Sequence, residues 1–185
     1  FFLEDSGVFQ FGVSGQLLPF FSRRIGLDGA GQKVPIAAAA KLTGQSGPWT
    51  YGLLDVQTES TAALESQNLF AGRVSRHLLK QSDFGLIWTQ GDPRGAGDAT
   101  TVGADLNLLT DEFLGSDTLR LSSFVAATEN EGPDEVDLAW QTRLSYPNDQ
   151  IEWSLSTGAV DEGFDPRLGF VDRTGVRRHE ASYRY

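Results

Sequence analysis

The stretch EVDLAWQTRLSYPNDQIEWSLSTG, residues 135–158, determines the fold that we expect for the whole chain. Every second residue of its first half is apolar or aromatic, apart from one threonine: Val136, Leu138, Trp140, Thr142, Leu144 and Tyr146. Most residues between them are polar, and after the turn PND the alternation resumes with Ile151, Trp153 and Leu155. Because successive side chains of a strand point to opposite faces, this pattern predicts an antiparallel hairpin with one apolar face.

The same alternation recurs along the chain between clusters of Gly, Pro, Asp, Asn and Ser. In TTVGADLNLL, for example, residues 102, 104, 106 and 108 are apolar, whereas Thr101, Asp105 and Asn107 between them are polar. These signals predict an all-β fold of about ten strands. We expect the strands at residues 17–27, 33–43, 48–58, 66–78, 83–91, 99–109, 117–128, 134–146, 149–159 and 174–185.

Composition excludes several classes of protein. The chain has 185 residues and a formal net charge of −10, which argues against nucleic acid as a partner, because binding a phosphate backbone requires an excess of Lys and Arg. It contains no cysteine, so disulfide frameworks and zinc knuckles are absent. No apolar run reaches the roughly 20 residues of a membrane helix. The chain also contains no methionine, so we expect that a leader was removed or that this is a piece of a longer protein.

Strand length and the links between strands favour a membrane barrel. Many predicted strands have about 10 to 12 residues, and an 11-residue strand tilted by roughly 45° covers about 25 Å, the height of the apolar band of an outer-membrane barrel. Short links such as GQSG, KQSD and PND alternate with longer acidic links such as GDPRGAGDA and TENEGPDE. Aromatic residues lie beside the short links, as in the aromatic girdles of such barrels. We therefore predict an antiparallel up-and-down transmembrane β-barrel that is part of a larger barrel.

The predicted barrel assigns roles to individual residues. Residues 1–16 form a lead-in segment that packs aromatic side chains, and residues 17–185 form the barrel fragment. The residues expected to face lipid are Val136, Leu138, Trp140, Leu144, Ile151 and Trp153. The charged residues expected to face the lumen are Arg73, Asp105, Arg120, Asp137, Arg143 and Glu152. The six charges would set solute selectivity if the lumen is open, or form a salt-bridge network if it is plugged.

Patterns typical of catalysis or metal binding are weak. FGVSGQ lacks the first glycine of a nucleophile elbow. His77 and His179 are the only histidines, too few for a three-histidine zinc site. Acidic loop residues such as Asp92 and Asp98 have no dedicated calcium spacing, so we interpret them as solvated. We expect no catalytic residue, no metal and no cofactor, and hence no enzyme.

Several segments follow one another in an order that resembles a known bacterial family. They are FFLEDSGVFQFG, LPFFSRRIG, PIAAAAKLTGQSGPWTYGLLDVQT, NLFAGRVSR, GADLNLL and FDPRLGFVDRTGVRR. The family, domain of unknown function number 5916, is an outer-membrane barrel that usually follows a carbohydrate-binding domain similar to binding-module family nine. The resemblance implies a piece of that barrel, starting close to its first residues and ending before the barrel does. The sugar-binding module of the family lies upstream, so its sugar contacts cannot be assigned to residues of this chain.

The predicted function is that of a bacterial outer-membrane β-barrel with a pore, transport or surface-anchoring role linked to carbohydrate handling. Its expected partners are outer-membrane lipid, a glycan or small solute, and other chains of an envelope complex. The alternative is a soluble β-sandwich carbohydrate-binding module, with Trp88, Trp140 and Trp153 in its core or on a sugar platform. A third hypothesis, a glycoside hydrolase, requires a carboxylate pair drawn from Asp105, Asp137 and Glu152 at fixed spacing.

Overall fold

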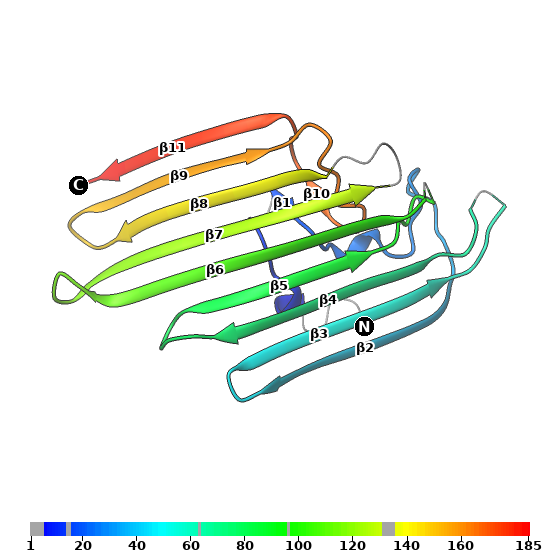
Figure 1. Ribbon diagram of the computed structural model, residues 1–185, viewed down its shortest axis with the longest axis horizontal. Coiled ribbons are helices and arrows are strands. Elements are labelled where there is room, and N and C mark those ends of the chain that lie inside the picture. Colours follow the sequence, from blue (N-terminus) through cyan, green and yellow to red (C-terminus); the bar gives the residue numbers. More distant parts are fainter. Residues whose placement is uncertain (1–5, 14–15, 63, 96, 131–135) are drawn as a thin grey trace.

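The fold is a large antiparallel sheet in which each strand lies beside its neighbour along the chain (Figure 1). The computed structural model describes residues 6–13, 16–62, 64–95, 97–130 and 136–185. Among these residues nine strands form the sheet, in the order β2 to β9 followed by β11. The strands are β2 (Ile36–Ser46), β3 (Trp49–Thr58), β4 (Asn68–His77), β5 (Asp83–Gln90), β6 (Ala99–Phe113), β7 (Asp117–Asn130), β8 (Asp137–Pro147), β9 (Glu152–Val160) and β11 (Val176–Arg184).

Strands β8 and β9 form the hairpin that the alternating pattern of the sequence predicted. Leu144 lies opposite Leu155, and Tyr146 lies opposite Trp153. Since partners directly across a ladder point to the same side of the sheet, the apolar residues of both arms share one face. The predicted pairing and the predicted faces are therefore confirmed for this hairpin.

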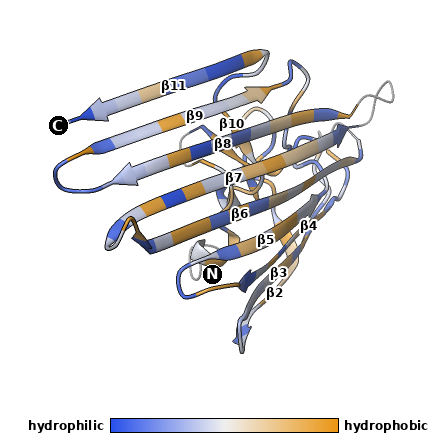
Figure 2. Cartoon of the chain, turned by 60° about the vertical axis from the view of Figure 1, so that its left-hand side comes forward, coloured by the Kyte–Doolittle hydropathy of each residue, from blue (hydrophilic) through white to orange (hydrophobic). Residues whose placement is uncertain are grey.

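The sheet is curved but has two free edges. Figure 2 shows that the sheet is curved, and we call its concave side the hollow. Among the described residues, β2 pairs only with β3 and β11 pairs only with β9. The all-β, antiparallel, up-and-down prediction is confirmed, whereas closure into a barrel is not observed and stays a prediction.

The segment that precedes the sheet lies in the hollow. It contains two short 3₁₀ helices, η1 (Ser6–Phe9) and η2 (Ser22–Arg24), and the strand β1 (Leu17–Leu18). β1 pairs with β10 (Phe170–Val171), a strand that the sequence did not predict. None of the helices among the described residues is long and apolar enough to cross a lipid bilayer.

The expectation of a strand over residues 17–27 is wrong for most of that range. Pro19 has no N–H to donate to a ladder, and the backbone N–H of Arg24 donates instead to the carbonyl of Phe21 in a tight turn. The apolar residues that produced the strand signal, including Phe20 and Ile25, pack against the concave side of the large sheet. Residues 6–13 and 16–34, which we call the N-terminal segment, therefore lie outside the large sheet.

The other strands agree with their predicted ranges within a few residues. β2 begins at Ile36 rather than at residue 33, because Pro35 interrupts the ladder. β6 and β7 extend further than expected, to Phe113 and Asn130.

The core lies between the N-terminal segment and the hollow side of the sheet, which we call the inner face. One cluster contains Phe9, Ile25, Leu54, Val56, Leu69, Ala71 and Leu168. The other contains Phe11, Leu17, Ile87, Ala126, Ala139 and Phe164. Aromatic packing by the lead-in segment is thus confirmed for Phe9 and Phe11. One face of the sheet is covered in this way, and the other has no protein layer over it among the described residues.

Candidate functional site

The uncovered side of the sheet, which we call the outer face, carries large apolar side chains that are exposed. Trp88 lies opposite Val102, and the pairing continues through Ala127 to Leu138, so these side chains form one row across the strands. Trp88 is 46% exposed and Trp140 is 40% exposed. Others on this face are Leu42, Leu53, Leu86, Val125 and Leu155. A contiguous apolar surface of this kind marks contact with a membrane or another protein.

Aromatic side chains gather at one end of the outer face. This end, which we call the short-turn end, has the turns between β2 and β3, β4 and β5, β6 and β7, and β8 and β9. Tyr146 and Trp153 stack there with ring centroids 5.9 Å apart, and the ring of Phe113 meets Tyr146 edge-on at 6.3 Å. The guanidinium of Arg76 lies 5.3 Å from the ring centre of Trp49. All four tryptophans of the chain, Trp49, Trp88, Trp140 and Trp153, lie on the outer face.

The structure separates the residues that we expected to face lipid into two groups. Leu138, Trp140, Leu144 and Trp153 lie on the outer face. Val136 and Ile151 lie just before β8 and β9 and are exposed by 58% and 38%. The sandwich alternative placed Trp88, Trp140 and Trp153 in a core or on a sugar platform. The part of the chain described here provides no second sheet that would put them in a core.

On the inner face, two of the predicted lumen charges meet in a buried ion pair. Nη1 and Nη2 of Arg73 lie 2.6 and 2.8 Å from the two carboxylate oxygens of Asp105. Arg73 lies on β4 and Asp105 on β6, and Gly85 of the intervening β5 leaves room for the guanidinium to cross. The side chains are only 5% and 11% exposed. The two charges therefore neutralise each other on the inner face.

The N-terminal segment covers this pair. The ring of Phe11 lies 5.3 Å from the guanidinium carbon of Arg73 and meets the ring of Phe124 edge-on at 5.8 Å. Gly103 makes room for the Phe11 ring, because a Cβ at that position would lie 2.6 Å from the ring. The contacts of Phe11 with both Arg73 and β6 hold the segment against the inner face.

The remaining predicted lumen charges do not form one cluster. Arg143 donates to the hydroxyl of Ser154 at 3.0 Å. Glu152 pairs with Arg184 at 2.7 Å in an exposed position. Arg120 is exposed on β7, and Asp137 lies beside Gly163. A ring of selectivity charges is therefore not formed by these residues.

Asp137 and Glu152 do not form the carboxylate pair of the glycosidase hypothesis, and Asp105, the third candidate, is bound to Arg73. Asp137 is the first residue of β8, whereas Glu152 lies opposite Pro147, the last residue of β8. Ten residues of strand separate the two ends, a distance of about 30 Å. Glycosidase carboxylates lie roughly 5 to 9.5 Å apart, so these two cannot act on one bond.

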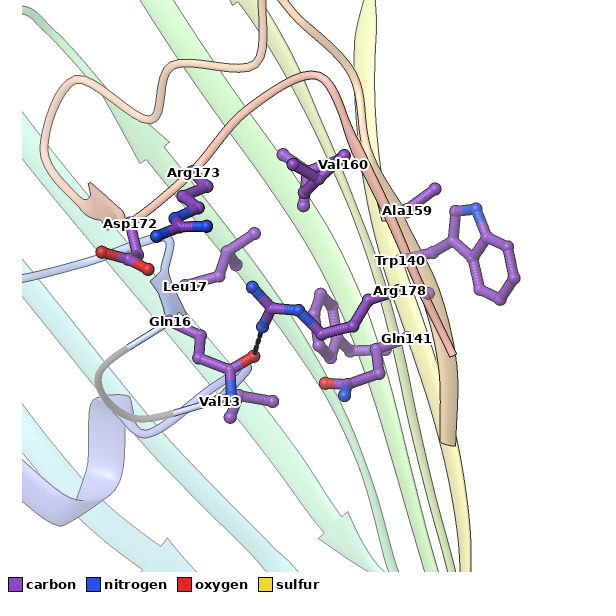
Figure 3. A pocket seen from close by; sticks show the side chains of 13 residues that line it. Val13, Gln16, Leu17, Trp140, Gln141, Ala159, Val160, Asp172, Arg173 and Arg178 are labelled. Carbon is purple, nitrogen blue, oxygen red and sulfur yellow. Dashed lines mark hydrogen bonds between the residues drawn. The ribbon is translucent and has the colours of Figure 1, made fainter. Parts of the chain in front are cut away.

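Two cavities lie between the N-terminal segment and the inner face. The larger, of about 410 Å³, is lined by amide and hydroxyl side chains that include Asn107, Ser122 and Gln141. The smaller, of about 40 Å³, is shown in Figure 3, where Arg178 reaches from β11 to bond the side chain of Gln16. In the same view Trp140 projects from the opposite side of the sheet. On β8, the polar Gln141 thus faces the cavities while its neighbour Trp140 faces outward.

Sequence reasoning missed one ionic cluster. Asp92 was interpreted as a solvated loop residue, but its side chain is 1% exposed and contacts Arg94 and Arg167. The signal that could have found it is a tripeptide, Asp-Pro-Arg, that occurs at residues 92–94 and again at 165–167. Among the residues that the structure describes, no group of three or more His, Cys, Asp or Glu could hold a metal ion.

Comparison with known proteins identifies no relative. No protein-family model matches the chain, no curated protein matches it, and no solved structure matches it. The family resemblance stated for the sequence therefore stays a prediction.

Proposed function

We propose that the sheet is part of the wall of a β-barrel in a bacterial outer membrane. Its outer face would contact the lipid tails, and its inner face would line a lumen that the N-terminal segment fills. The observation that carries this proposal is the division between the two faces: exposed Leu, Val and Trp on one, and buried polar and charged groups under an aromatic segment on the other.

The dimensions of the sheet support the same proposal. The outer face of β8 is apolar or aromatic from Leu138 to Tyr146, with one threonine between. Eight residue steps cover about 27 Å along the strand, or about 20 Å across a membrane at a tilt of roughly 40°. This is close to the apolar band of outer-membrane barrels, and the rings at the short-turn end lie where an aromatic girdle would be.

In a lipid environment, the two free edges of the sheet must pair with other strands. Unpaired backbone N–H and C=O groups in lipid cost several kcal/mol each, so β2 and β11 must find partner strands. The proposal therefore includes pairing of both edges, by further strands of the same polypeptide or by a second copy of the chain.

Among the roles expected for such a barrel, the packing of the N-terminal segment favours anchoring over open transport. Phe9, Phe11, Leu17 and Ile25 are all buried against the sheet. Among the described residues, a lumen occupied in this way leaves the polar cavity of about 410 Å³ as the larger of the two spaces for a small solute. We infer a filled barrel that holds other domains or chains at the cell surface, with the link to carbohydrate handling depending on the family resemblance.

Tryptophan fluorescence tests which face meets lipid. We expect that the protein in liposomes with brominated acyl chains loses most of its fluorescence, because every tryptophan lies on the outer face. Variants that retain only Trp88 or only Trp140, with the other tryptophans replaced by phenylalanine, assign the quenching to single positions.

The matched control is a tryptophan on the inner face. In a background without the native tryptophans, Phe124→Trp places an indole beside Phe11, where brominated lipid should not quench it. The extracted protein should also change its gel mobility on heating, as barrels do. If Trp88 and the indole introduced by Phe124→Trp resist brominated lipid equally, in a protein that stays soluble without detergent, the soluble carbohydrate-binding alternative is favoured.

A further inference from the structure

Two loops of the chain carry the same tripeptide, Asp-Pro-Arg. Residues 92–94 lie between β5 and β6, and residues 165–167 lie between β9 and β10. In the sheet, β6, β7 and β8 separate β5 from β9. The two loops leave the end of the sheet opposite the short turns, which we call the loop end, so any contact between them bridges the hollow at that end.

The two tripeptides contact each other reciprocally. Nη2 of Arg94 lies 3.0 and 2.8 Å from the carboxylate oxygens of Asp165, and Nε of Arg94 lies 3.4 Å from Oδ1 of Asp92. Nη1 of Arg167 lies 3.2 Å from Oδ2 of Asp92, and Nε of Arg167 lies 3.3 Å from Oδ2 of Asp165. Each arginine thus touches both aspartates. We call this arrangement the Asp-Pro-Arg clasp.

Burial makes the clasp different from a surface ion pair. Asp92 is 1% exposed, the side chains of Arg167 and Arg94 are 22% and 29% exposed, and the side chain of Asp165 is 40% exposed. A buried carboxylate requires a counter-charge, so removing an arginine leaves Asp92 in an unfavourable environment. Both prolines are buried and restrict the backbone that presents the charges.

The clasp is also tied to the core and to the segment in the hollow. Phe164 and Leu168, which flank the second tripeptide, are 0% and 1% exposed and belong to the two core clusters. Asn130 at the end of β7 donates to the carbonyl of Asp165 at 3.2 Å. Gly29 of the N-terminal segment lies against the side chain of Arg94. Two loops, one strand end and the N-terminal segment therefore converge on the clasp.

We propose that the Asp-Pro-Arg clasp is a latch that keeps the loop end of the hollow closed to ions and solutes. The inference rests on the proposed barrel, in which this hollow is the lumen. Because the clasp joins loops from strands that are not neighbours, breaking it frees the first loop to move with the hairpin of β5 and β6, and the second to move with β10. The barrel wall depends on the strand ladders and remains intact when the clasp is broken.

The absence of cysteine in the chain permits a reversible test. The double variant Arg94→Cys, Asp165→Cys removes one arm of the clasp, and KCl conductance is measured in planar bilayers. We expect a rise of roughly tenfold, which corresponds to about 1.4 kcal/mol in an open-to-closed equilibrium. A bifunctional thiosulfonate reagent that joins the two cysteines should return the conductance to the native level, and a reductant should raise it again.

The exposed pair of Glu152 and Arg184 provides the matched control. The variant Glu152→Cys, Arg184→Cys removes an ion pair of similar length from the short-turn end, and its conductance should stay native. Arg94→Gln, which keeps the side chain up to Cδ but removes the charged Nη2 group that contacts Asp165, replaces the double variant if the latter does not assemble. If a variant keeps its heat-modifiable gel mobility but has native conductance, the latch proposal is wrong and the barrel proposal is unaffected. Failure of the native protein to shift on heating or to enter lipid overturns the barrel itself.

Discussion

The outer and inner faces of the sheet are built by the same strands but differ in their exposure and in their polar groups. Along β8, Trp140 is exposed on the outer face, whereas its neighbour Ala139 is completely buried on the inner face. The inner face is covered by protein that satisfies its polar groups, as in the pair of Arg73 and Asp105. The outer face has few polar groups, such as Ser123 and Thr142, which bond each other, and no protein layer covers it among the described residues. The difference teaches that the sheet has a core on one side and requires a different environment on the other.

The largest expected effect comes from breaking the buried pair on the inner face. Arg73→Ala leaves Asp105 without its counter-charge, and we expect the free energy of unfolding to fall by about 3–5 kcal/mol. Denaturant titration in liposomes, followed by tryptophan fluorescence, measures the change. The double variant Arg73→Met, Asp105→Leu removes both charges and should cost clearly less than Arg73→Ala. Equal costs for the single and double variants would contradict the burial of this ion pair.

The next effect concerns the outer face. Leu86 is 46% exposed in the middle of the apolar surface, so in the proposed barrel Leu86→Arg places a charge in lipid and should destabilise by about 2–4 kcal/mol. Asn107→Arg, which points to the polar cavity of the inner face and lies opposite Asp83, is the control and should change stability by about 0.5 kcal/mol or less. The same denaturant titration compares them. A harmless arginine at position 86 would mean that the outer face meets water.

A smaller effect is expected where the N-terminal segment meets the sheet. Gly103→Ala would push the added methyl group against the Phe11 ring, and overpacking of this kind costs about 1–3 kcal/mol. Protease digestion can detect whether the N-terminal segment loosens. Phe11→Leu combined with Gly103→Ala should restore part of the loss. Unchanged stability and unchanged digestion in Gly103→Ala would show that the segment is not packed on β6.

The smallest effect is expected for a solvent-exposed ion pair. The side chain of Arg184 is 81% exposed where it meets Glu152, so Arg184→Ala should lower the free energy of unfolding by about 0–1 kcal/mol. High salt should reduce even this contribution, because exposed charges are screened. A cost as large as that of Arg73→Ala would indicate that another chain buries this edge of the sheet.

Sequence reasoning was most successful where local pattern and tertiary contact agree. The hairpin of β8 and β9 was predicted with the correct faces, because alternation over a whole strand leaves only one way to bury one side. It failed at residues 17–27, where apolar residues pack against the inner face but do not pair with any strand of the large sheet. Phe20 and Ile25 are buried in either arrangement, so hydrophobicity alone could not distinguish a strand from a packed turn.

The candidate site was predicted only in part for a similar reason. Arg73 and Asp105 were both placed on the polar face, but their pairing depends on Gly85 between them. Glu152 was placed with the lumen charges, yet its partner is Arg184 of β11. The Asp-Pro-Arg clasp was not predicted, since its two halves are far apart in the chain and a repeated tripeptide does not say that its copies meet.

The sequence by itself determined that this protein is an antiparallel all-β chain whose strands have one apolar and one polar face. Period-two alternation and turn residues act locally, so they can be read without knowing what each strand contacts. Only the tertiary structure decided which face the protein covers with its own N-terminal segment, and which charges pair inside it. Those choices depend on contacts between residues distant in the chain, and no local pattern carries that information.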